Sequence, residues 1–439
     1  MDRSSRPGTF PASSSKTRIV DVQVPVAVDH AYSYRVPDGM EVRPGEVVTV
    51  PLGPREVVAV VWAENPAPDP RLHNRLKDIS GKLDVPPLKD ELRTLIDWVA
   101  NYTLSPRGMM MRMSLRMGEH LGPERTRPGV RLSGEPPRRI TPARRRLLAV
   151  LSDGLLRAKS DAAREAGVSA GVVDGLVDEG TLTTEPMPPP PSPPPPDPDF
   201  AVPDFSRSQR AAVDAMRALA SNGTFHAALL DGVTGSGKTE VYFEAVAETV
   251  RRGRQVLILM PEIALTGQFR DRFAARFGER PLEWHSELTP RNRARNWAAI
   301  AAGEAQVVVG ARSALFLPYA SLGLIIVDEE HDQAYKQDEG VRYHARDMAV
   351  VRAHVAKIPI VLASATPSVE SEVNARKGRY QRIALTSRFG GQHLPQIELI
   401  DLRREGPSRG RFISPRLAGE IGSAIERREQ ALLFLNRRG

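Results

Sequence analysis

The stretch GVTGSGKTE at 232–240 constrains the fold more than any other part of the chain. It fits the phosphate-loop pattern G-x-x-x-x-G-K-[ST], in which glycines let backbone N–H groups wrap around the phosphates of a nucleotide. An apolar run, HAALLDG, precedes it, and a helix-forming run, TEVYFEAVAETV, follows it. This order favours a phosphate loop over a glycine-rich structural turn. The residues expected at the nucleotide are Gly232, Val233, Thr234, Gly235, Ser236, Gly237, Lys238 and Thr239.

Each polar residue of this loop has an expected role. Lys238 is predicted to reach the β- and γ-phosphates of ATP, and the Thr239 hydroxyl to ligate Mg²⁺. ATP and Mg²⁺ are therefore the predicted cofactors.

Further apolar runs follow the loop: QVLILM at 255–260, AQVVVG at 305–310, LGLIIVDE at 322–329 and IPIVLASAT at 358–366. Such continuous runs indicate strands buried on both faces, and helical stretches separate them. The alternation predicts an α/β motor lobe built on a doubly wound parallel sheet, over residues 200–392. The order of the strands cannot be read from the sequence.

An acidic cluster, DEEHD at 328–332, ends one of these runs. In open α/β sheets the carboxyl ends of the strands face the ligand. Asp328 is expected to hold Mg²⁺ through water, and Glu329 to orient or deprotonate an attacking water. A solvated acidic turn is the alternative interpretation.

The first half of the chain has a different pattern. Short β-rich runs broken by Pro, Gly and Asp predict a small β-rich domain at 18–115, and 1–17 is predicted to be a disordered tail. Helix, helix, glycine turn and strand outline a winged helix at 116–186, with Thr141 as the N-cap of its first helix. Such a module serves either DNA contact or protein packing. The proline run at 187–199 predicts a semi-rigid spacer, or a ligand for an SH3-like partner.

Composition narrows the possibilities further. The 439-residue chain has no cysteine, which excludes disulfides, thiol nucleophiles and cysteine-based zinc sites, so no zinc is expected. Its formal net charge of +8 permits binding to a polyanion. No apolar run is long enough for a membrane span, and the N-terminus lacks a secretory pattern, so we expect a cytoplasmic protein with no membrane partner.

Several motifs together resemble those of superfamily-two helicases: the phosphate loop, DEEHD and SATP at 364–367. Within that superfamily, the chain resembles the PriA family of replication restart helicases. The residues that carry this closer resemblance are MPEIALTGQ at 260–268, GARSALFLP at 310–318, DEEHDQAYKQDEGVRYHAR at 328–346 and FLNRRG at 434–439.

The resemblance implies further site residues. Gln209 in FSRSQ would contact adenine, while His331, Ser364 and Thr366 would couple the nucleotide to DNA. The loop after DEEHD resembles one that senses single-stranded DNA, with aromatic rings stacking on bases and cations meeting phosphates. The residues expected there are Tyr335, Lys336, Arg342, Tyr343 and Arg346. In the β-rich domain, the residues expected to capture the 3′ end of a DNA strand are Tyr32, Gly53 and Lys77.

By resemblance, the function would be ATP-driven 3′-to-5′ unwinding of DNA, with reloading of the replicative helicase at stalled forks. The implied partners are forked and single-stranded DNA, primosome and helicase-loading proteins, and single-stranded DNA-binding protein. A non-enzymatic fork-binding scaffold and an unrelated superfamily-two motor, such as a restriction-type translocase, are the alternatives.

The chain also departs from the family pattern. It stops at FLNRRG, so 393–439 is expected to be an incomplete start of the second motor lobe. The arginine finger and the zinc-binding cysteines of the family would follow that point, so we expect feeble hydrolysis by this chain alone. Val341 stands where the family has a stacking Trp, and Ser33 stands in place of the Asp of a Phe-Asp-Tyr trio. These two changes call DNA sensing and recognition of the terminal hydroxyl into question.

Overall fold

The computed structural model describes residues 18–67, 69, 71, 75–115, 117, 121, 127–187, 194–262, 267–385 and 396–434. The predicted tail at 1–17, most of 116–126, the proline run at 188–193, the predicted boundary at 392–393 and the last five residues lie outside this part. The chain separates into two compact units, 1–388 and 389–439.

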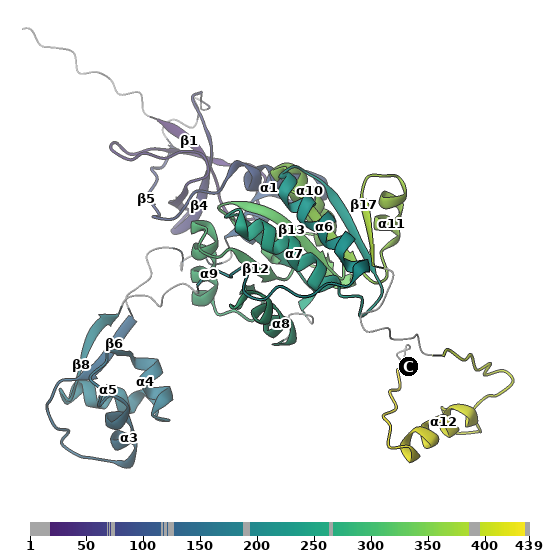
Figure 1. Cartoon of the computed structure of the whole chain (residues 1–439). Helices are drawn as coiled ribbons and strands as arrows, with labels where there is room; N and C mark the ends of the chain where they lie inside the picture. The colour runs from purple at the N-terminus through teal and green to yellow at the C-terminus, as the bar shows by residue number, and fades with distance from the viewer. Residues whose placement is uncertain are drawn as a thin grey trace, which may run out of the picture. The chain divides into compact units, whose positions relative to one another are not determined.

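The N-terminal domain is a five-stranded antiparallel sheet in the order β2-β1-β4-β3-β5 (Figure 1). Its strands are β1 (Ile19–Gln23), β2 (Tyr32–Arg35), β3 (Val47–Leu52), β4 (Arg55–Glu64) and β5 (Gly81–Lys82). Alternate residues of β1, β3 and β4 are valine or alanine and enclose a small core of their own, so the period-two pattern of the sequence sets this domain.

Two helices join this domain to the motor lobe. α1 (Asp90–Thr103) buries Leu92, Leu95, Ile96 and Val99, and α2 (Arg107–Ser114) buries Met110 and Met111, in the same hydrophobic cluster as the motor strands. The indole N–H of Trp297, in the motor lobe, donates to the Ser114 carbonyl at 2.8 Å. One face of the N-terminal sheet, through Val47, Val60 and Trp62, belongs to this shared cluster, while the other face packs in the domain's own core.

A glycine on α2 is required by this packing. A Cβ on Gly108 would lie 1.9 Å from the Val26 carbonyl oxygen, and backbone cannot move aside as a side chain can. We expect Gly108→Ala to lower the free energy of unfolding by about 1–3 kcal/mol, the usual cost of overpacking. Thermal denaturation checks this against Gly81→Ala, where nothing lies within 4 Å. Equal melting temperatures for the two variants would contradict the packing argument.

Residues 127–187 form the winged-helix domain. It contains β6 (Arg127–Leu132), α3 (Pro142–Val150), β7 (Arg157–Ala158), α4 (Lys159–Glu165), α5 (Ala170–Asp178) and β8 (Leu182–Met187), with a sheet in the order β7-β6-β8. The prediction of Thr141 as N-cap is confirmed, because its side chain accepts a hydrogen bond from the Arg144 N–H.

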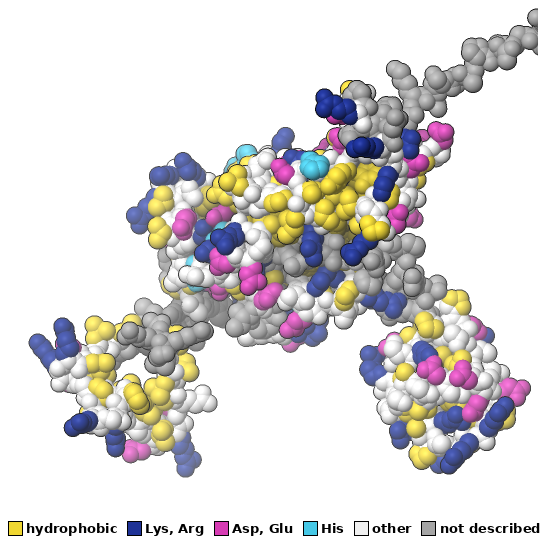
Figure 2. Space-filling view, turned by 180° about the vertical axis from the view of Figure 1, so that it is seen from behind, with side chains coloured by type: hydrophobic (Ala, Val, Ile, Leu, Met, Phe, Trp, Pro, Cys, Tyr) yellow, Lys and Arg dark blue, Asp and Glu magenta, His cyan; other side chains and the backbone are white. Residues whose placement is uncertain are grey.

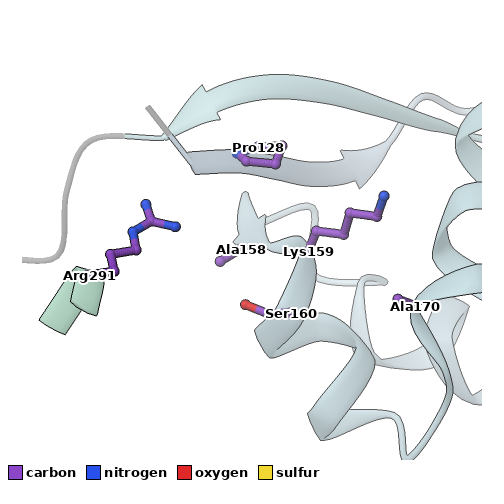
Figure 3. A pocket seen from close by; sticks show the side chains of 6 residues that line it. All are labelled: Pro128, Ala158, Lys159, Ser160, Ala170 and Arg291. Atoms are coloured by element: carbon purple, nitrogen blue, oxygen red, sulfur yellow. The ribbon is translucent and has the colours of Figure 1, made fainter. Parts of the chain in front are cut away.

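The surface of this domain is mixed in charge. Figure 2 shows Lys and Arg side chains over it, but α5 carries no Lys or Arg and contains Asp174 and Asp178. A hollow lined by Pro128, Ala158, Lys159, Ser160 and Ala170 is shown in Figure 3, where the sixth labelled side chain, Arg291, comes from the motor lobe. Because α5 has no cation, it is poorly suited to lie against DNA phosphates.

The end of the proline-rich linker is attached to the motor lobe. The Asp197 N–H donates to the Phe277 carbonyl at 2.9 Å, and Arg251 forms an ion pair with Asp199. The guanidinium of Arg276 donates to the Pro198 carbonyl at 2.9 Å. Residues 197–201 are thus packed against the motor lobe, at the end of the segment that the composition predicts to be a semi-rigid spacer.

The motor lobe contains a seven-stranded parallel sheet in the order β11-β12-β10-β13-β16-β9-β17. Its strands are β9 (Ala227–Gly232), β10 (Gln255–Leu259), β11 (Leu282–Trp284), β12 (Val307–Gly310), β13 (Leu322–Asp328), β16 (Ile360–Ser364) and β17 (Gln381–Leu385). This sheet, with the N-terminal domain and the winged helix, confirms the predicted multidomain fold class.

Helices cover both faces of this sheet (Figure 1). α6 (Arg207–Asn222), α7 (Lys238–Arg251) and α8 (Gly267–Phe277) bury residues in one cluster. α9 (Pro290–Ala302), the 3₁₀ helix η4 (Arg312–Phe316) and α10 (Ala345–Ala356) bury residues in the other, together with α1. Along β13, Ile325 and Val327 face the cluster that contains α9, η4 and α10, and Leu324 and Ile326 face the cluster that contains α6, α7 and α8. This alternation is expected for a strand buried on both faces.

The second unit is described by itself. It contains α12 (Pro415–Glu426), which Ser414 caps by accepting a hydrogen bond from the Leu417 N–H. No residue of this helix is buried.

Across the part of the chain that the structure describes, we find no helix with both the length and the apolar character needed to cross a membrane.

Candidate functional site

Strand order brings three motifs to one edge of the motor sheet. β16 lies between β9 and β13, and its Ser364 is paired with Asp231 at the end of β9. Asp328, at the end of β13, is paired with Ala363 of the same central strand. The carboxyl ends of these three strands therefore lie side by side at one edge of the sheet. Open α/β sheets bind their ligands at this edge.

The phosphate loop connects β9 to α7. Gly235 and Gly237 have φ of 79° and 84°, a conformation that glycine adopts without strain. The Lys238 ammonium is buried and donates to the Gly232 carbonyl at 2.8 Å. The buried Ser236 hydroxyl has no hydrogen-bond partner among the described residues. The loop thus holds a cation and a free hydroxyl group where a phosphate would be bound.

Gln209 links α6 to this loop. Its side-chain oxygen accepts from the Ser206 N–H at 3.0 Å, completing a capping box, and its amide donates to the Ser236 carbonyl at 3.0 Å. The structure places Gln209 beside the phosphate loop, and these two bonds hold the loop against the start of α6. Its predicted contact with adenine can use the remaining amide N–H and the second lone pair of the side-chain oxygen.

Asp328 is held in one orientation. One carboxylate oxygen accepts from the Tyr242 hydroxyl at 2.8 Å, and the other accepts from the Glu329 N–H at 3.0 Å. Burial raises the pKa of the Asp328 carboxyl, while the Tyr242 hydrogen bond opposes that rise. Sequence analysis did not identify Tyr242, because a tyrosine at helical spacing looks like any core residue.

Glu329 follows immediately and faces solvent, with 42% of its side chain exposed. Its φ of 48° is in the left-handed region, which costs a non-glycine residue free energy and is often found at functional sites. This turn separates the buried Asp328 from an accessible carboxylate, so two adjacent acids can serve different roles.

These groups fit a magnesium nucleotide. Mg²⁺ prefers oxygen ligands and commonly uses one or two protein groups together with phosphates. The Thr239 hydroxyl and the Asp328 carboxylate supply such oxygens, and the unpaired Ser236 hydroxyl lies in the same loop as Lys238. The residues present therefore suit the predicted cofactors.

The structure brings His331, Ser364 and Thr366 together as the resemblance implied. The imidazole Nδ1 of His331 lies 2.8 Å from the Ser364 hydroxyl, which accepts from the Thr366 N–H at 3.0 Å. The same Nδ1 is 3.6 Å from the Glu329 carboxylate. A short chain of contacts thus runs from Glu329 to the SATP segment.

Glu330 is a second residue that sequence analysis missed. Its carboxylate is fully buried and accepts from the Ser368 N–H at 2.7 Å and from the hydroxyls of Ser368 and Ser371, each at 2.9 Å. It also pairs with buried Arg346 at 3.2 Å. The third letter of DEEH was the available signal, because Glu330 lies between two residues with predicted roles, Glu329 and His331.

The loop after DEEHD contains η5 (Gln333–Tyr335), β14 (Lys336–Gln337) and β15 (Tyr343–His344). Tyr335 is fully buried, and its hydroxyl donates to backbone carbonyls of Asp328 and Leu259. Tyr343 is buried against Phe316. Base stacking by these two rings is incompatible with the structure, because neither ring has an exposed face.

The basic residues of the loop divide in two. Arg346 is buried and paired with Glu330 and Asp347, so the expectation that it meets phosphates is wrong for this structure. Lys336 and Arg342 are exposed, as a phosphate contact requires. Val341, which replaces a stacking Trp of the family, is buried in the core. Only Lys336 and Arg342, of the five predicted loop residues, are available to DNA.

In the N-terminal domain, the Lys77 ammonium donates to the Gly53 carbonyl at 3.2 Å, and both residues are exposed. Tyr32 lies half-buried on β2. Ser33 pairs directly with Asp21 across the sheet and donates to its carboxylate at 2.7 Å, and the Asn65 amide donates to the same oxygen at 2.9 Å. A carboxylate is therefore present next to the position where the family trio has its Asp.

Comparison with known proteins agrees with these observations. Residues 21–116 match a family model described as the 3′ DNA-binding domain of PriA, and residues 206–374 match the DEAD/DEAH box helicase model. The replication restart protein PriA of Rickettsia felis is 32% identical over 423 residues, and that of Haemophilus influenzae is 35% identical over 433 residues. Each alignment covers 96% of this chain but only 54% and 59% of the relative, so the chain spans little more than half their length.

A solved structure of RecG bound to a three-way DNA junction aligns with 78% of this chain and 46% of RecG, with a TM-score of 0.34 and 13% identity. The match of residues 21–116 to the 3′ DNA-binding domain of PriA, the helicase match that follows it, and the alignments over 96% of this chain support its assignment to the PriA replication restart helicases.

Proposed function

We propose that the chain is the part of a replication restart helicase that binds DNA ends at forks and binds Mg²⁺-ATP. The observation that carries the proposal is the convergence of Lys238, Asp328 and the His331–Ser364 contact at one sheet edge. The parent activity would be ATP-driven 3′-to-5′ unwinding of DNA, followed by reloading of the replicative helicase with primosome and helicase-loading proteins. Single-stranded DNA-binding protein would be a further partner, and the cytoplasm the site of action.

In this mechanism each side chain of the site has one task. Lys238 leaves the Gly232 carbonyl to meet the β- and γ-phosphates, and Gln209 keeps the loop in place. Thr239 would ligate the magnesium ion and Asp328 would hold it through water, and the bound ion would supply charge neutralisation at the phosphates. Glu329 orients the attacking water and accepts its proton.

The path from hydrolysis to DNA would run through two contacts. His331 connects the turn at Glu329 to Ser364. The buried Glu330 connects the same turn to Ser368, the N-cap of α11 (Val369–Arg376), which is the helix after SATP. Tyr335 connects the same turn to the loop that exposes Lys336 and Arg342. A change at the γ-phosphate would therefore move both segments together.

Phosphate release from ATP tests the enzymatic proposal. Forked DNA with a free 3′ end is expected to stimulate the feeble release by the unchanged chain, and Glu329→Gln is expected to abolish the stimulation while leaving Mg²⁺-ATP binding intact. Equal stimulation in Glu329→Gln would contradict the role given to this carboxylate.

Capture of a 3′ end gives a separate prediction. With Ser33 in place of an acid, we propose that Asp21 supplies the carboxylate near the terminal hydroxyl, held by Ser33 and Asn65. Asp21→Asn is expected to lower the preference for a 3′-hydroxyl end over a 3′-phosphate end by about tenfold, the effect of one hydrogen bond to a charged group.

Fluorescence anisotropy with the two DNA ends measures that preference. Asp78→Asn is the matched control, because Asp78 is in the same domain and pairs with Arg35 on the surface. An unchanged end preference in Asp21→Asn, or an equal loss in both variants, would rule out the role of Asp21.

A non-enzymatic scaffold remains the second candidate function. It would bind forked DNA with an affinity that does not depend on nucleotide.

A further inference from the structure

One buried tyrosine contacts a carboxylate that would hold magnesium. Tyr242 lies on α7, less than one turn after Thr239, and its side chain has no exposed surface. Its hydroxyl donates to the Asp328 carboxylate at 2.8 Å. This hydrogen bond ties Asp328, at the end of β13, to the helix that carries Thr239.

The ring and the hydroxyl of Tyr242 serve different purposes. The ring packs edge-to-face against Phe243 at 5.3 Å between centroids and belongs to the core between α6, α7 and the sheet. A phenylalanine would fill that space equally well. The hydroxyl therefore has to be explained by its partner, the Asp328 carboxylate, which lies on a separate element, β13.

The Asp328 carboxylate has no cationic partner within ion-pair distance among the described residues. Its oxygens are held by the Tyr242 hydroxyl and the Glu329 N–H alone, and its pairing in β13 holds its backbone. A carboxylate at the start of a turn has several accessible rotamers. Without the tyrosine hydroxyl, the side chain would be free to turn away from Thr239.

We propose that Tyr242 is a positioning residue for magnesium, which holds the Asp328 carboxylate in the orientation relative to Thr239 that a magnesium nucleotide needs. This inference rests on the proposed function and deepens it at the same site. Tyr242 touches neither the nucleotide nor the metal. It lowers the cost of ordering their ligands, which is the usual effect of pre-organisation on affinity.

The experiment uses Tyr242→Phe, which removes the hydroxyl and keeps the ring. Binding of a fluorescent ATP analogue is titrated at a series of Mg²⁺ concentrations and again in EDTA. We expect the Mg²⁺ concentration for half-maximal enhancement of binding to rise about tenfold, as for the loss of one hydrogen bond to a charged group. Affinity in EDTA is expected to be unchanged, because Lys238 and the loop backbone are untouched.

Tyr319→Phe is the matched control. Tyr319 is also buried in the motor lobe, and its hydroxyl donates to the Ala314 carbonyl at 3.2 Å, away from the phosphate loop in the sequence and on the other face of the sheet. The control loses the same atom from an equally buried site, so it reports the purely structural cost. We expect it to leave both titrations unchanged.

A double-mutant cycle with Asp328→Asn gives a second readout. If Tyr242 acts through Asp328, then Tyr242→Phe raises the Mg²⁺ requirement less in the Asp328→Asn background than in the unchanged chain. Equal additions in the two backgrounds would overturn the proposal. So would a parallel loss of affinity in Mg²⁺ and in EDTA, which would mean that Tyr242 acts through the fold alone.

The inference and the proposed function can fail separately. If the unchanged chain binds nucleotide and Tyr242→Phe has the same Mg²⁺ requirement, only the role of Tyr242 is overturned. Absence of any nucleotide binding by the unchanged chain overturns the proposed function and this inference with it.

Discussion

Replacing Lys238 with alanine is expected to weaken ATP binding by about 100-fold or more, because the ammonium supplies charge-assisted hydrogen bonds to phosphate, each worth roughly 1.5–3 kcal/mol. The structure supports this size of effect, since the ammonium is buried at the start of α7 and its present partner is only the neutral Gly232 carbonyl. Isothermal titration of the chain with Mg²⁺-ATP measures the loss.

Lys377→Ala is the control for charge, because Lys377 is an exposed lysine at the end of α11 in the same lobe. It is expected to bind ATP as the unchanged chain does. Melting temperatures of the two variants show whether Lys238→Ala remains folded. An unchanged affinity in folded Lys238→Ala would contradict the assignment of a phosphate loop.

Replacing Glu330 with alanine is expected to lower the free energy of unfolding of the motor lobe by about 3–5 kcal/mol, the usual cost of removing one partner from a buried ion pair. The change leaves buried Arg346 without its buried counter-charge and leaves two serine hydroxyls and the Ser368 N–H without their acceptor. Thermal denaturation with and without Mg²⁺-ATP measures the loss.

Glu370→Ala separates this effect from simple loss of charge. Glu370 lies 3.8 Å from the same Arg346, but its side chain is 71% exposed, so the pair is screened by water. We expect a shift in melting temperature within experimental error. If Glu330→Ala were as stable as Glu370→Ala, the buried network would not hold the DEEHD turn to α11.

The regular parts of the motor lobe could be predicted from the sequence because they follow local rules. Continuous apolar runs form β9, β10, β12, β13 and β16. The spacing of the glycines in the phosphate loop likewise indicates the backbone conformation of that loop. The edge strands β11 and β17 were not identified, because β11 has three residues and β17 has exposed positions at alternate sites. The position of β16 between β9 and β13 depends on long-range pairing, which no local pattern records.

The candidate DNA loop shows where sequence reasoning fails. Tyr335 and Tyr343 stand among charged residues, a pattern that suggests exposed rings, yet the fold turns both rings inward and uses the Tyr335 hydroxyl to bind backbone carbonyls. Arg346 likewise finds a buried carboxylate from DEEHD rather than a phosphate. In each case a tertiary partner decides the role, and that partner is distant in the sequence or belongs to another motif.

The shared core of α1 and α10 was also beyond local prediction. The helical spacing at 87–103 identified the helix, but an amphipathic helix does not reveal which surface it covers. Its packing joins one face of the N-terminal sheet, through Val47, Val60 and Trp62, to the core beneath the motor strands.

The affinity for forked DNA with a free 3′ end, measured with and without Mg²⁺ and a non-hydrolysable ATP analogue, tests the central claim most directly. We predict that the nucleotide changes the fork affinity of the unchanged chain and has no such effect on Lys238→Ala. An affinity that is the same in the presence and absence of nucleotide would contradict a motor and favour the scaffold.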